Sequence, residues 1–166
     1  MKNRLKIVLT FLSLIIAANV FAQQGQGVAQ ILEAYLITVD SSGNEIQTPI
    51  TEENSGITPG DVIEYRQILT NNLDNGITQL QPVLPIPIGM EYVLESASPS
   101  PEGASLSNTG NTFQRLPLTR QVRQPDGTTV EEEVPGREYR RLRWLVPSLE
   151  AGDQVILVAR VKVIDN

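Results

Sequence analysis

Acidic residues are the first candidates for chemistry in this 166-residue chain, because the sequence contains no histidine and no cysteine. Their absence excludes a Ser-His-Asp triad, a thiolate nucleophile, a zinc site with Cys or His ligands, and a disulfide. Two carboxylates facing each other across a cleft could still hydrolyse a glycoside. None of the 19 acidic residues lies in a pattern that implies such a buried pair. We therefore expect a protein that is not an enzyme and has no catalytic residue and no cofactor.

Two loops could bind calcium, which prefers several oxygen ligands from one loop. The first contains Asp40, Ser42 and Asn44, and the second contains Asn71, Asn72, Asp74 and Asn75. Neither loop has the charge count or the spacing of a known calcium loop. The same residue types are common in turns, because their side chains bond to the nearby backbone and tolerate positive φ. We favour turns and keep calcium as the alternative.

Four arginines concentrate positive charge in an otherwise acidic chain: Arg137, Arg140, Arg141 and Arg143. Ion pairs with nearby glutamates would account for them. The alternative is a docking patch for an acidic partner, because a cluster of one charge sign attracts the opposite sign.

The aromatic side chains are expected to be core residues. Tyr65, Tyr92 and Trp144 fall on the inward positions of predicted strands. A carbohydrate-binding platform would instead need two or three exposed rings in one plane. Tyr35 and Tyr139 fall on the less buried positions, and they are the rings that such a platform could use.

Residues 1–22 are predicted to be a secretory signal peptide. Lys2, Arg4 and Lys6 precede an apolar stretch over residues 7–18, and Val20 and Ala22 supply small residues at positions −3 and −1 of a cleavage site. The apolar stretch is short for a bilayer, which needs ~20 residues. An uncleaved anchor is the alternative. We expect an exported protein in the periplasm, on the cell surface or outside the cell, with no membrane span after cleavage.

Cleavage would make the protein more acidic. The whole chain has 13 basic and 19 acidic residues, a net charge of −6. The leader contains three of the basic residues and no acid, so 10 basic residues face 19 acidic ones in the remainder. A domain of this charge repels phosphate backbones, and nucleic acid is not expected as a partner.

Residues 29–166 are predicted to form one all-β domain after a flexible segment at residues 23–28. Alternating apolar and polar residues predict strands over residues 29–40, 45–50, 61–71, 77–83, 91–97, 138–146 and 153–164. Residues 98–111 and 147–152 are expected to be turns, and no helix is expected after the leader. About 7–9 strands in one compact unit are typical of an immunoglobulin-like antiparallel β-sandwich.

A long hairpin is predicted around the turn at residues 124–127, where Gly127 suits the left-handed position. In the common register for this turn, Val122 faces Val130, Arg120 faces Glu132, and Leu118 faces Val134. The three glutamates at residues 131–133 would then be solvated strand charge with one cross-strand ion pair. A site for a cation or a basic partner is the alternative. A row of like charges also discourages edge-to-edge aggregation.

Four phrases of the sequence together resemble a known bacterial family. They are the Pro-Gly turn and strand at residues 58–65, Thr70-Asn71, the Leu-Pro to Tyr-Val stretch at residues 84–93, and Trp144 followed by residues 149–153 and 161–163. In this order they are similar to the conserved-repeat family called domain of unknown function 11, over about residues 30–164. The resemblance implies an immunoglobulin-like sandwich on an exported or surface protein. It carries no catalytic residue. The loop after Asn71 and the hairpin at residues 116–137 are longer than the family pattern, and Val83 replaces a frequent Asp.

These observations predict an exported, non-enzymatic module that acts by protein–protein contact in the cell envelope, a surface layer or the extracellular matrix. Other envelope or surface proteins, or further copies of this chain, would be its partners, because an exposed sheet edge can accept a strand. The chain ends soon after its last predicted strand, and we expect no sorting tail or second domain. The alternative is a ligand-binding module for cell-wall glycan or calcium.

Overall fold

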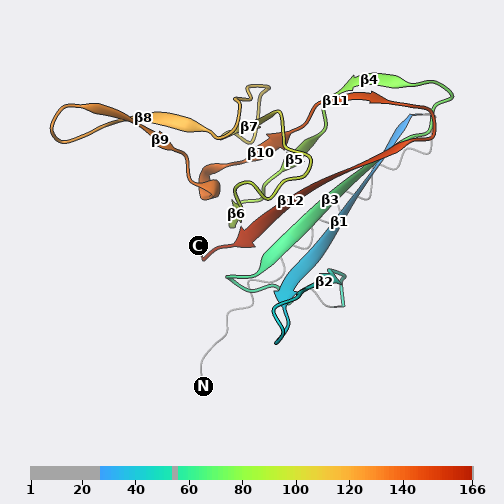
Figure 1. Ribbon diagram of the computed structural model, residues 1–166, viewed down its shortest axis with the longest axis horizontal. Coiled ribbons are helices and arrows are strands. Elements are labelled where there is room, and N and C mark those ends of the chain that lie inside the picture. Colours follow the sequence, from blue (N-terminus) through green and yellow to red (C-terminus); the bar gives the residue numbers. More distant parts are fainter. Residues whose placement is uncertain (1–26, 54–55, 166) are drawn as a thin grey trace.

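The computed structural model describes residues 27–53 and 56–165. Over these residues the chain forms twelve strands and one short 3₁₀ helix, and every strand pair is antiparallel (Figure 1). The predicted all-β antiparallel fold is therefore confirmed. The predicted signal peptide and residues 23–26 of the predicted flexible segment lie outside the described residues.

The larger sheet contains five strands in the order β2-β1-β3-β12-β6. Their bounds are β1 (Val28–Val39), β2 (Glu45–Pro49), β3 (Val62–Asn71), β6 (Met90–Tyr92) and β12 (Gln154–Val163). The alternation in β3 and β12 explains this layer, because every second residue faces the core: Ile63, Tyr65, Gln67 and Leu69 on β3, and Leu157, Ala159 and Val161 on β12, are buried. On the opposite side of the sheet, the residues of β3 are mostly half-buried.

A turn before β3 sets the start of that strand. The Asp61 carboxylate accepts hydrogen bonds from the Thr58 backbone N–H at 2.7 Å and from its hydroxyl at 3.0 Å. Gly60 adopts a φ of 98°, which an L side chain rarely adopts. The predicted Pro-Gly turn that leads into a strand with a buried tyrosine is therefore confirmed.

The second layer is made of shorter strands. β5 (Val83–Pro85), β10 (Arg141–Arg143) and β7 (Gly103–Ser105) form a three-stranded sheet, and β4 (Ile77–Leu80) pairs with β11 (Val146–Leu149). One hydrophobic cluster joins the two layers, since it contains Tyr65 and Leu157 from the large sheet with Leu142 and Trp144 from the second. The indole N–H of Trp144 donates to the carbonyl of Pro99 at 2.7 Å. The chain thus forms a sandwich with one shared core.

Twelve strands replace the expected seven to nine, because one predicted strand is divided and two strands lie in predicted turns. Other predicted strands are shorter in the structure. The predicted strand at residues 77–83 is divided into β4, which ends at Leu80, and β5, which begins at Val83 after Pro82. The strand predicted over residues 91–97 ends at Tyr92. The one predicted over residues 138–146 begins only at Arg141, because the 3₁₀ helix η2 (Gly136–Glu138) precedes it. Residues 103–105 and 147–149, predicted as turns, belong to β7 and β11.

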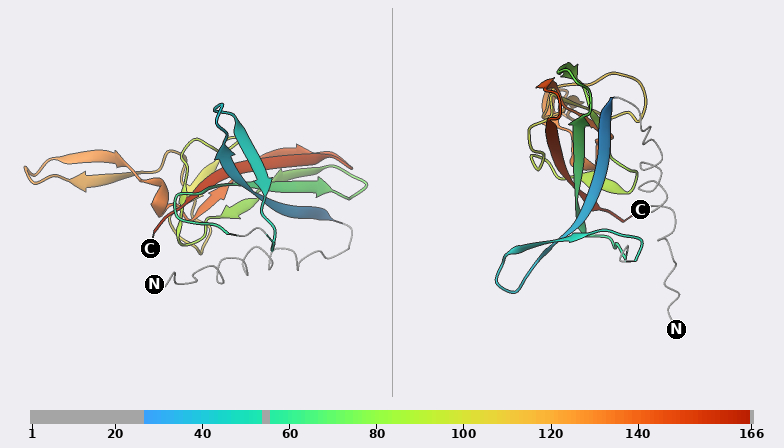
Figure 2. Two further views of the ribbon diagram at one scale, coloured as in Figure 1. Left: turned by 90° about the horizontal axis from the view of Figure 1, so that it is seen from below. Right: turned by 90° about the vertical axis from the view of Figure 1, so that its right-hand side faces the viewer.

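A hairpin extends away from the body of the sandwich (Figures 1 and 2). It consists of β8 (Thr119–Arg123) and β9 (Thr129–Glu133), which we call the arm. Its register is the predicted one, with Val122 opposite Val130, and Gly127 has a φ of 87°. The predicted three-residue turn is therefore confirmed. The turn between β1 and β2 also projects, on another side of the molecule (Figure 2).

Candidate functional site

The core fixes the arm to the sandwich at its base. Leu118 and Val134 are 2% and 1% exposed, and the Val134 N–H donates to the Leu118 carbonyl at 2.8 Å. The Leu118 N–H in turn donates to the hydroxyl of Tyr139 at 2.9 Å. Beyond this base all of β9 and most of β8 are exposed. The core therefore holds the arm in place, while its two strands stand in solvent.

The charges on the arm are arranged differently from the prediction. Arg120 lies opposite Glu132 in register, but its guanidinium pairs with Glu138 at 2.9 Å. The expected cross-strand ion pair is therefore wrong in its partner, because η2 brings Glu138 within reach of the same guanidinium. Among the described residues, no ion pair involves Arg123 or Glu133. β9 thus presents three carboxylates to solvent, and β8 presents the guanidinium of Arg123.

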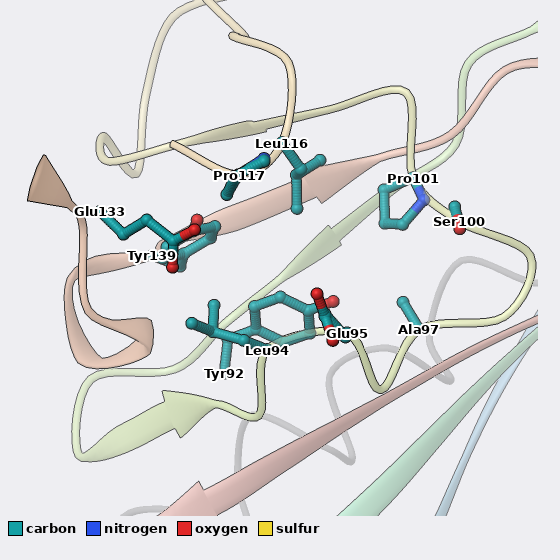
Figure 3. A pocket seen from close by; sticks show the side chains of 10 residues that line it. All are labelled: Tyr92, Leu94, Glu95, Ala97, Ser100, Pro101, Leu116, Pro117, Glu133 and Tyr139. Carbon is teal, nitrogen blue, oxygen red and sulfur yellow. The ribbon is translucent and has the colours of Figure 1, made fainter. Parts of the chain in front are cut away.

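A pocket of about 410 Å³ opens beside the base of the arm (Figure 3). Its lining is mostly apolar, from Leu94, Ala97, Pro101, Leu116 and Pro117, and its polar groups come from Tyr92, Glu95, Ser100, Glu133 and Tyr139. Leu116 and Pro117 lie across the pocket from Tyr92 and Leu94 (Figure 3). Apolar walls with a few polar groups are typical of small-ligand sites. Sequence reasoning missed this pocket, since its walls come from irregular segments without a periodic pattern.

The two tyrosines of the pocket belong mainly to the core. Their ring centroids lie 5.5 Å apart, and Tyr92 and Tyr139 are 2% and 0% exposed. Burial is the main cause that raises the pKa of both hydroxyls above the usual value. The prediction that Tyr139 lies on a less buried position is wrong, because η2 turns this residue inward before β10 begins. Tyr65, Tyr92 and Trp144 are all buried.

The arginine cluster is largely engaged within the chain. The Arg141 guanidinium donates to the carbonyls of Ser107, Thr109 and Gly110 at 2.8, 2.7 and 2.7 Å, and it lies over the Phe113 ring. We call residues 106–113, which this side chain orders, the Arg141 loop. Arg141 is therefore a structural residue rather than a free cation.

The other three arginines differ in their contacts. Arg143 also lies over the ring of the Arg141 loop and pairs with Glu102 at 3.3 Å. Arg140 donates to the carbonyls of Arg137 and Tyr139, and the Arg137 side chain is exposed. Within the described part of the chain, pairing with a glutamate therefore applies to Arg143 alone of the four arginines. Arg137 and Arg140 retain the cationic surface that a docking patch would use.

The loop after β3 is organised around one buried amide. Asn71 is 0% exposed, and its Nδ2 donates to the carbonyls of Asn75, Leu149 and Glu150 at 2.9, 2.9 and 3.1 Å. Its Oδ1 accepts the Leu73 N–H at 3.0 Å. The amide therefore already serves the turn. Asn72, Asp74 and Asn75 are exposed.

The loop between β1 and β2 is a turn closed by Asp40. Its carboxylate accepts the backbone N–H groups of Ser42 and Asn44 at 2.8 and 2.9 Å. These hydrogen bonds, first the one from Asn44, lower the pKa of Asp40 below the usual value. In the described part of the chain, no group of three or more Asp or Glu residues could hold a metal ion. The side chains of Asp40 and Asn71 therefore both hold turns through backbone hydrogen bonds.

The outer face of the large sheet carries a charge network that sequence reasoning missed. Glu64 is 4% exposed and accepts hydrogen bonds from Arg66 at 2.7 Å and from Arg160 at 3.0 Å. The Arg160 guanidinium also donates to both carboxylate oxygens of Glu45 at 2.8 Å. This pairing is the largest cause of the raised pKa of Arg160. The outward parity of these residues is visible in the sequence, but their pairing depends on the strand order. The network therefore links β2, β3 and β12 through their side chains.

Tyr35 belongs to the same face. The Arg66 guanidinium lies 4.3 Å from its ring centroid, and its hydroxyl donates to Glu33 at 2.9 Å. The ring is half-buried. One face of it is therefore covered and is not offered to a sugar.

Comparisons with known proteins add no relative. No protein-family model, no curated protein and no solved structure matches this chain. Within the described residues, no helix combines the length and the apolar character needed to cross a bilayer. The function must therefore be argued from the chain's own surfaces.

Proposed function

We propose that this protein is an exported, non-enzymatic β-sandwich module that works by protein–protein contact in the cell envelope, a surface layer or the extracellular matrix. The observation that carries the proposal is the arm, a solvent-exposed hairpin held by a buried base. A two-stranded hairpin is marginally stable by itself in water. Its exposed strands bury little core, and their open edges are suited to a partner strand.

The proposed export rests on the sequence of residues 1–22, which has a basic start, an apolar stretch and small residues before the cleavage position. We also propose that the sandwich is an immunoglobulin-like member of the domain of unknown function 11 family. The buried Tyr65 and Trp144 and the turn at Thr58 support this proposal, since they occupy the positions that the resemblance implies. Other envelope proteins or further copies of the chain are the proposed partners.

The test compares cell fractions before and after the arm is shortened. Arg120 and Glu132 lie opposite each other, so replacing residues 121–131 with Asn-Gly joins them through a two-residue turn. We expect the intact protein in the envelope or the medium, with its N-terminus near Gln23, and loss of envelope association in the shortened variant. The matched control replaces residues 41–43 with Asn-Gly at the other projecting turn. Cytosolic protein with an intact leader, or unchanged association of the shortened variant, would refute the proposal.

The pocket supports a second candidate, a binding module for cell-wall glycan. Its apolar wall and its carboxylates could contact the carbon and hydroxyl groups of a sugar. A thermal-shift screen with glycan fragments tests this, because a ligand at 100 times its Kd stabilises the folded state by about 2.7 kcal/mol. A shift that Glu133→Gln reduces and Glu132→Gln leaves unchanged would support the pocket. No shift with any fragment would eliminate it.

A further inference from the structure

Most sheet edges of the described residues are closed to an incoming strand. On the large sheet, the β2 edge ends in Pro49, which has no N–H, and the β6 edge is covered by η2, where Gly136 approaches the Tyr92 carbonyl closely. On the second layer, β5 ends in Pro85, and β7 is covered by Gln114, which exchanges two backbone hydrogen bonds with Ala104. Natural sheets close their edges by such devices to prevent aggregation.

The β4–β11 pair and the outer edge of β9 are also blocked. Gln79 has a left-handed backbone within β4, and β11 contains Pro147. β9 carries Glu131, Glu132 and Glu133, which repel a second acidic strand. Among the described strands, β8 remains as an edge with no proline, no acid, no left-handed residue and no covering segment.

The backbone of β8 is oriented for pairing. The Gln124 N–H donates to Thr128 and the Val134 N–H donates to Leu118, so residues 118, 120, 122 and 124 face β9 with their backbone groups. Hydrogen-bonded and non-hydrogen-bonded pairs alternate in an antiparallel ladder. The N–H and C=O groups of Thr119, Gln121 and Arg123 therefore point outward from the hairpin.

We propose that β8 is the docking edge for a second copy of this chain, with the two β8 strands antiparallel about a two-fold axis at Gln121. Gln121 then pairs with its own copy, and Thr119 pairs with Arg123 of the other chain. Each pair exchanges two backbone hydrogen bonds, which makes about six in all. The two sandwiches lie at opposite ends of the four-stranded sheet, because each arm extends away from its body (Figure 2).

Charge complementarity favours this register. Thr119 lies opposite Glu133 within each arm. In the dimer, Arg123 of the first chain lies opposite Thr119 of the second chain. A single row on one face of the sheet therefore runs from Arg123 of the first chain over Thr119 to Glu133 of the second chain. Roughly 10 Å separates the Cα atoms of Arg123 and that Glu133, a span that an arginine and a glutamate bridge together over a threonine. A β9–β9 pairing would instead bring six carboxylates together. The second copy therefore docks on β8.

This inference deepens the proposed function, because it names the surface and one partner of a contact module, but the pairing requires only the folded arm. Two single-cysteine variants of the full chain, isolated after processing by the cell, test the β8 pairing, since the chain has no other cysteine. In a hydrogen-bonded antiparallel pair the Cα atoms are about 5.5 Å apart, which suits a disulfide. We expect Gln121→Cys to form a crosslinked dimer on mild oxidation. The control Glu131→Cys, on the same face of the neighbouring strand, stays uncrosslinked.

Sedimentation of the cysteine-free protein and its variants provides the second test. Gln121→Pro removes an outward N–H without breaking the β8–β9 ladder, and we expect a monomer, whereas Gln121→Thr stays dimeric. Arg123→Glu is expected to weaken the dimer about tenfold, and the charge swap Arg123→Glu with Glu133→Arg restores it.

A wild-type monomer, equal crosslinking of the two cysteine variants or a dimer unaffected by Gln121→Pro would overturn the inference. Failure of this pairing is distinguishable from failure of the proposed function. If Gln121→Pro is monomeric yet still fractionates with envelopes, the inference stands and the envelope contact uses another surface. A β8-dependent dimer found only in the cytosol would support the inference and refute the proposed function.

Discussion

Replacing Asn71 with Asp would separate a structural turn from a calcium site. The Nδ2 group of this fully buried residue donates to three backbone carbonyls, of Asn75, Leu149 and Glu150. Asn71→Asp keeps the shape of the side chain and the oxygen that accepts the Leu73 N–H. It replaces the donor with an oxygen that faces those carbonyls. The substitution therefore changes the charge and the hydrogen-bond donors of the side chain but hardly its size.

The expected destabilisation follows from the lost hydrogen bonds. A buried carbonyl left without its donor costs about 1–3 kcal/mol, and a buried charge adds to this. With three carbonyls sharing one NH₂ group, we expect the free energy of unfolding to fall by about 3–5 kcal/mol at pH 7. For a domain of this size the melting temperature would fall by roughly 10–20 °C.

The loss should depend on pH. Burial among carbonyl oxygens raises the pKa of the introduced carboxyl in the folded state, because its protonated form can donate a hydrogen bond. A group whose folded pKa is raised stabilises the fold below its unfolded pKa of about 3.9, and this stabilisation is lost as pH rises through the folded pKa. The difference from wild type should therefore be smaller at pH 4 than at pH 7.

Thermal melts followed by far-UV circular dichroism, at pH 4 and pH 7 with and without calcium, measure these effects. The matched control is Asn72→Asp, the same change at an exposed neighbour, which should stay within about 0.5 kcal/mol of wild type. Wild-type stability of Asn71→Asp at pH 7 would refute the reasoning. A calcium-dependent rise of its melting temperature above that of the wild type would make the loop a metal site.

Three further substitutions test the core and the Arg141 loop. Burial raises the pKa of Tyr65 to about 12. Its neutral form therefore stabilises the fold up to pH 10, and this contribution of about 2–3 kcal/mol is lost between pH 10 and 12. Tyr65→Phe should raise the alkaline unfolding midpoint in a circular-dichroism titration. Trp144→Phe removes the hydrogen bond to the Pro99 carbonyl and should cost about 2–4 kcal/mol in urea unfolding followed by circular dichroism. Arg141→Ala should make the Arg141 loop sensitive to limited proteolysis, whereas the exposed Arg137→Ala should not. An unchanged alkaline midpoint, a wild-type urea midpoint or equal proteolysis of both variants would contradict the respective prediction.

The long strands and the arm could be predicted because their signals are local. Residues 155–163 alternate over a full strand, and one face of β12 is buried as that alternation requires. The register of the arm follows from its turn, since Gly127 at a positive φ fixes which residues face each other. In both cases a few neighbouring residues contain the whole geometric constraint.

The short strands and the polar contacts depend on partners that are distant in the sequence. β7 has only three residues and forms because β10 lies beside it. Glu138 captures Arg120 only after η2 places it near the arm. The pairing of Arg160 with Glu45 joins residues 115 positions apart and requires the strand order of the large sheet. No local pattern encodes such pairings, so the sequence predicts the class of fold better than its surface.

The two projecting hairpins differ in how firmly side chains tie them to the body, and this difference favours the arm for the proposed contact. The β1–β2 hairpin is tied back to the large sheet by side chains, because Arg160 grips Glu45 and Arg66 reaches Gln47. An incoming strand on that edge would disturb a network that clamps the sheet. Beyond its buried base, and counting only residues that the structure describes, the arm has a single ion pair to the body, from Arg120. Pairing along the outer edge of β8 breaks no interaction that holds the sandwich together. The proposed contact through the arm would therefore leave the core of this disulfide-free chain unchanged.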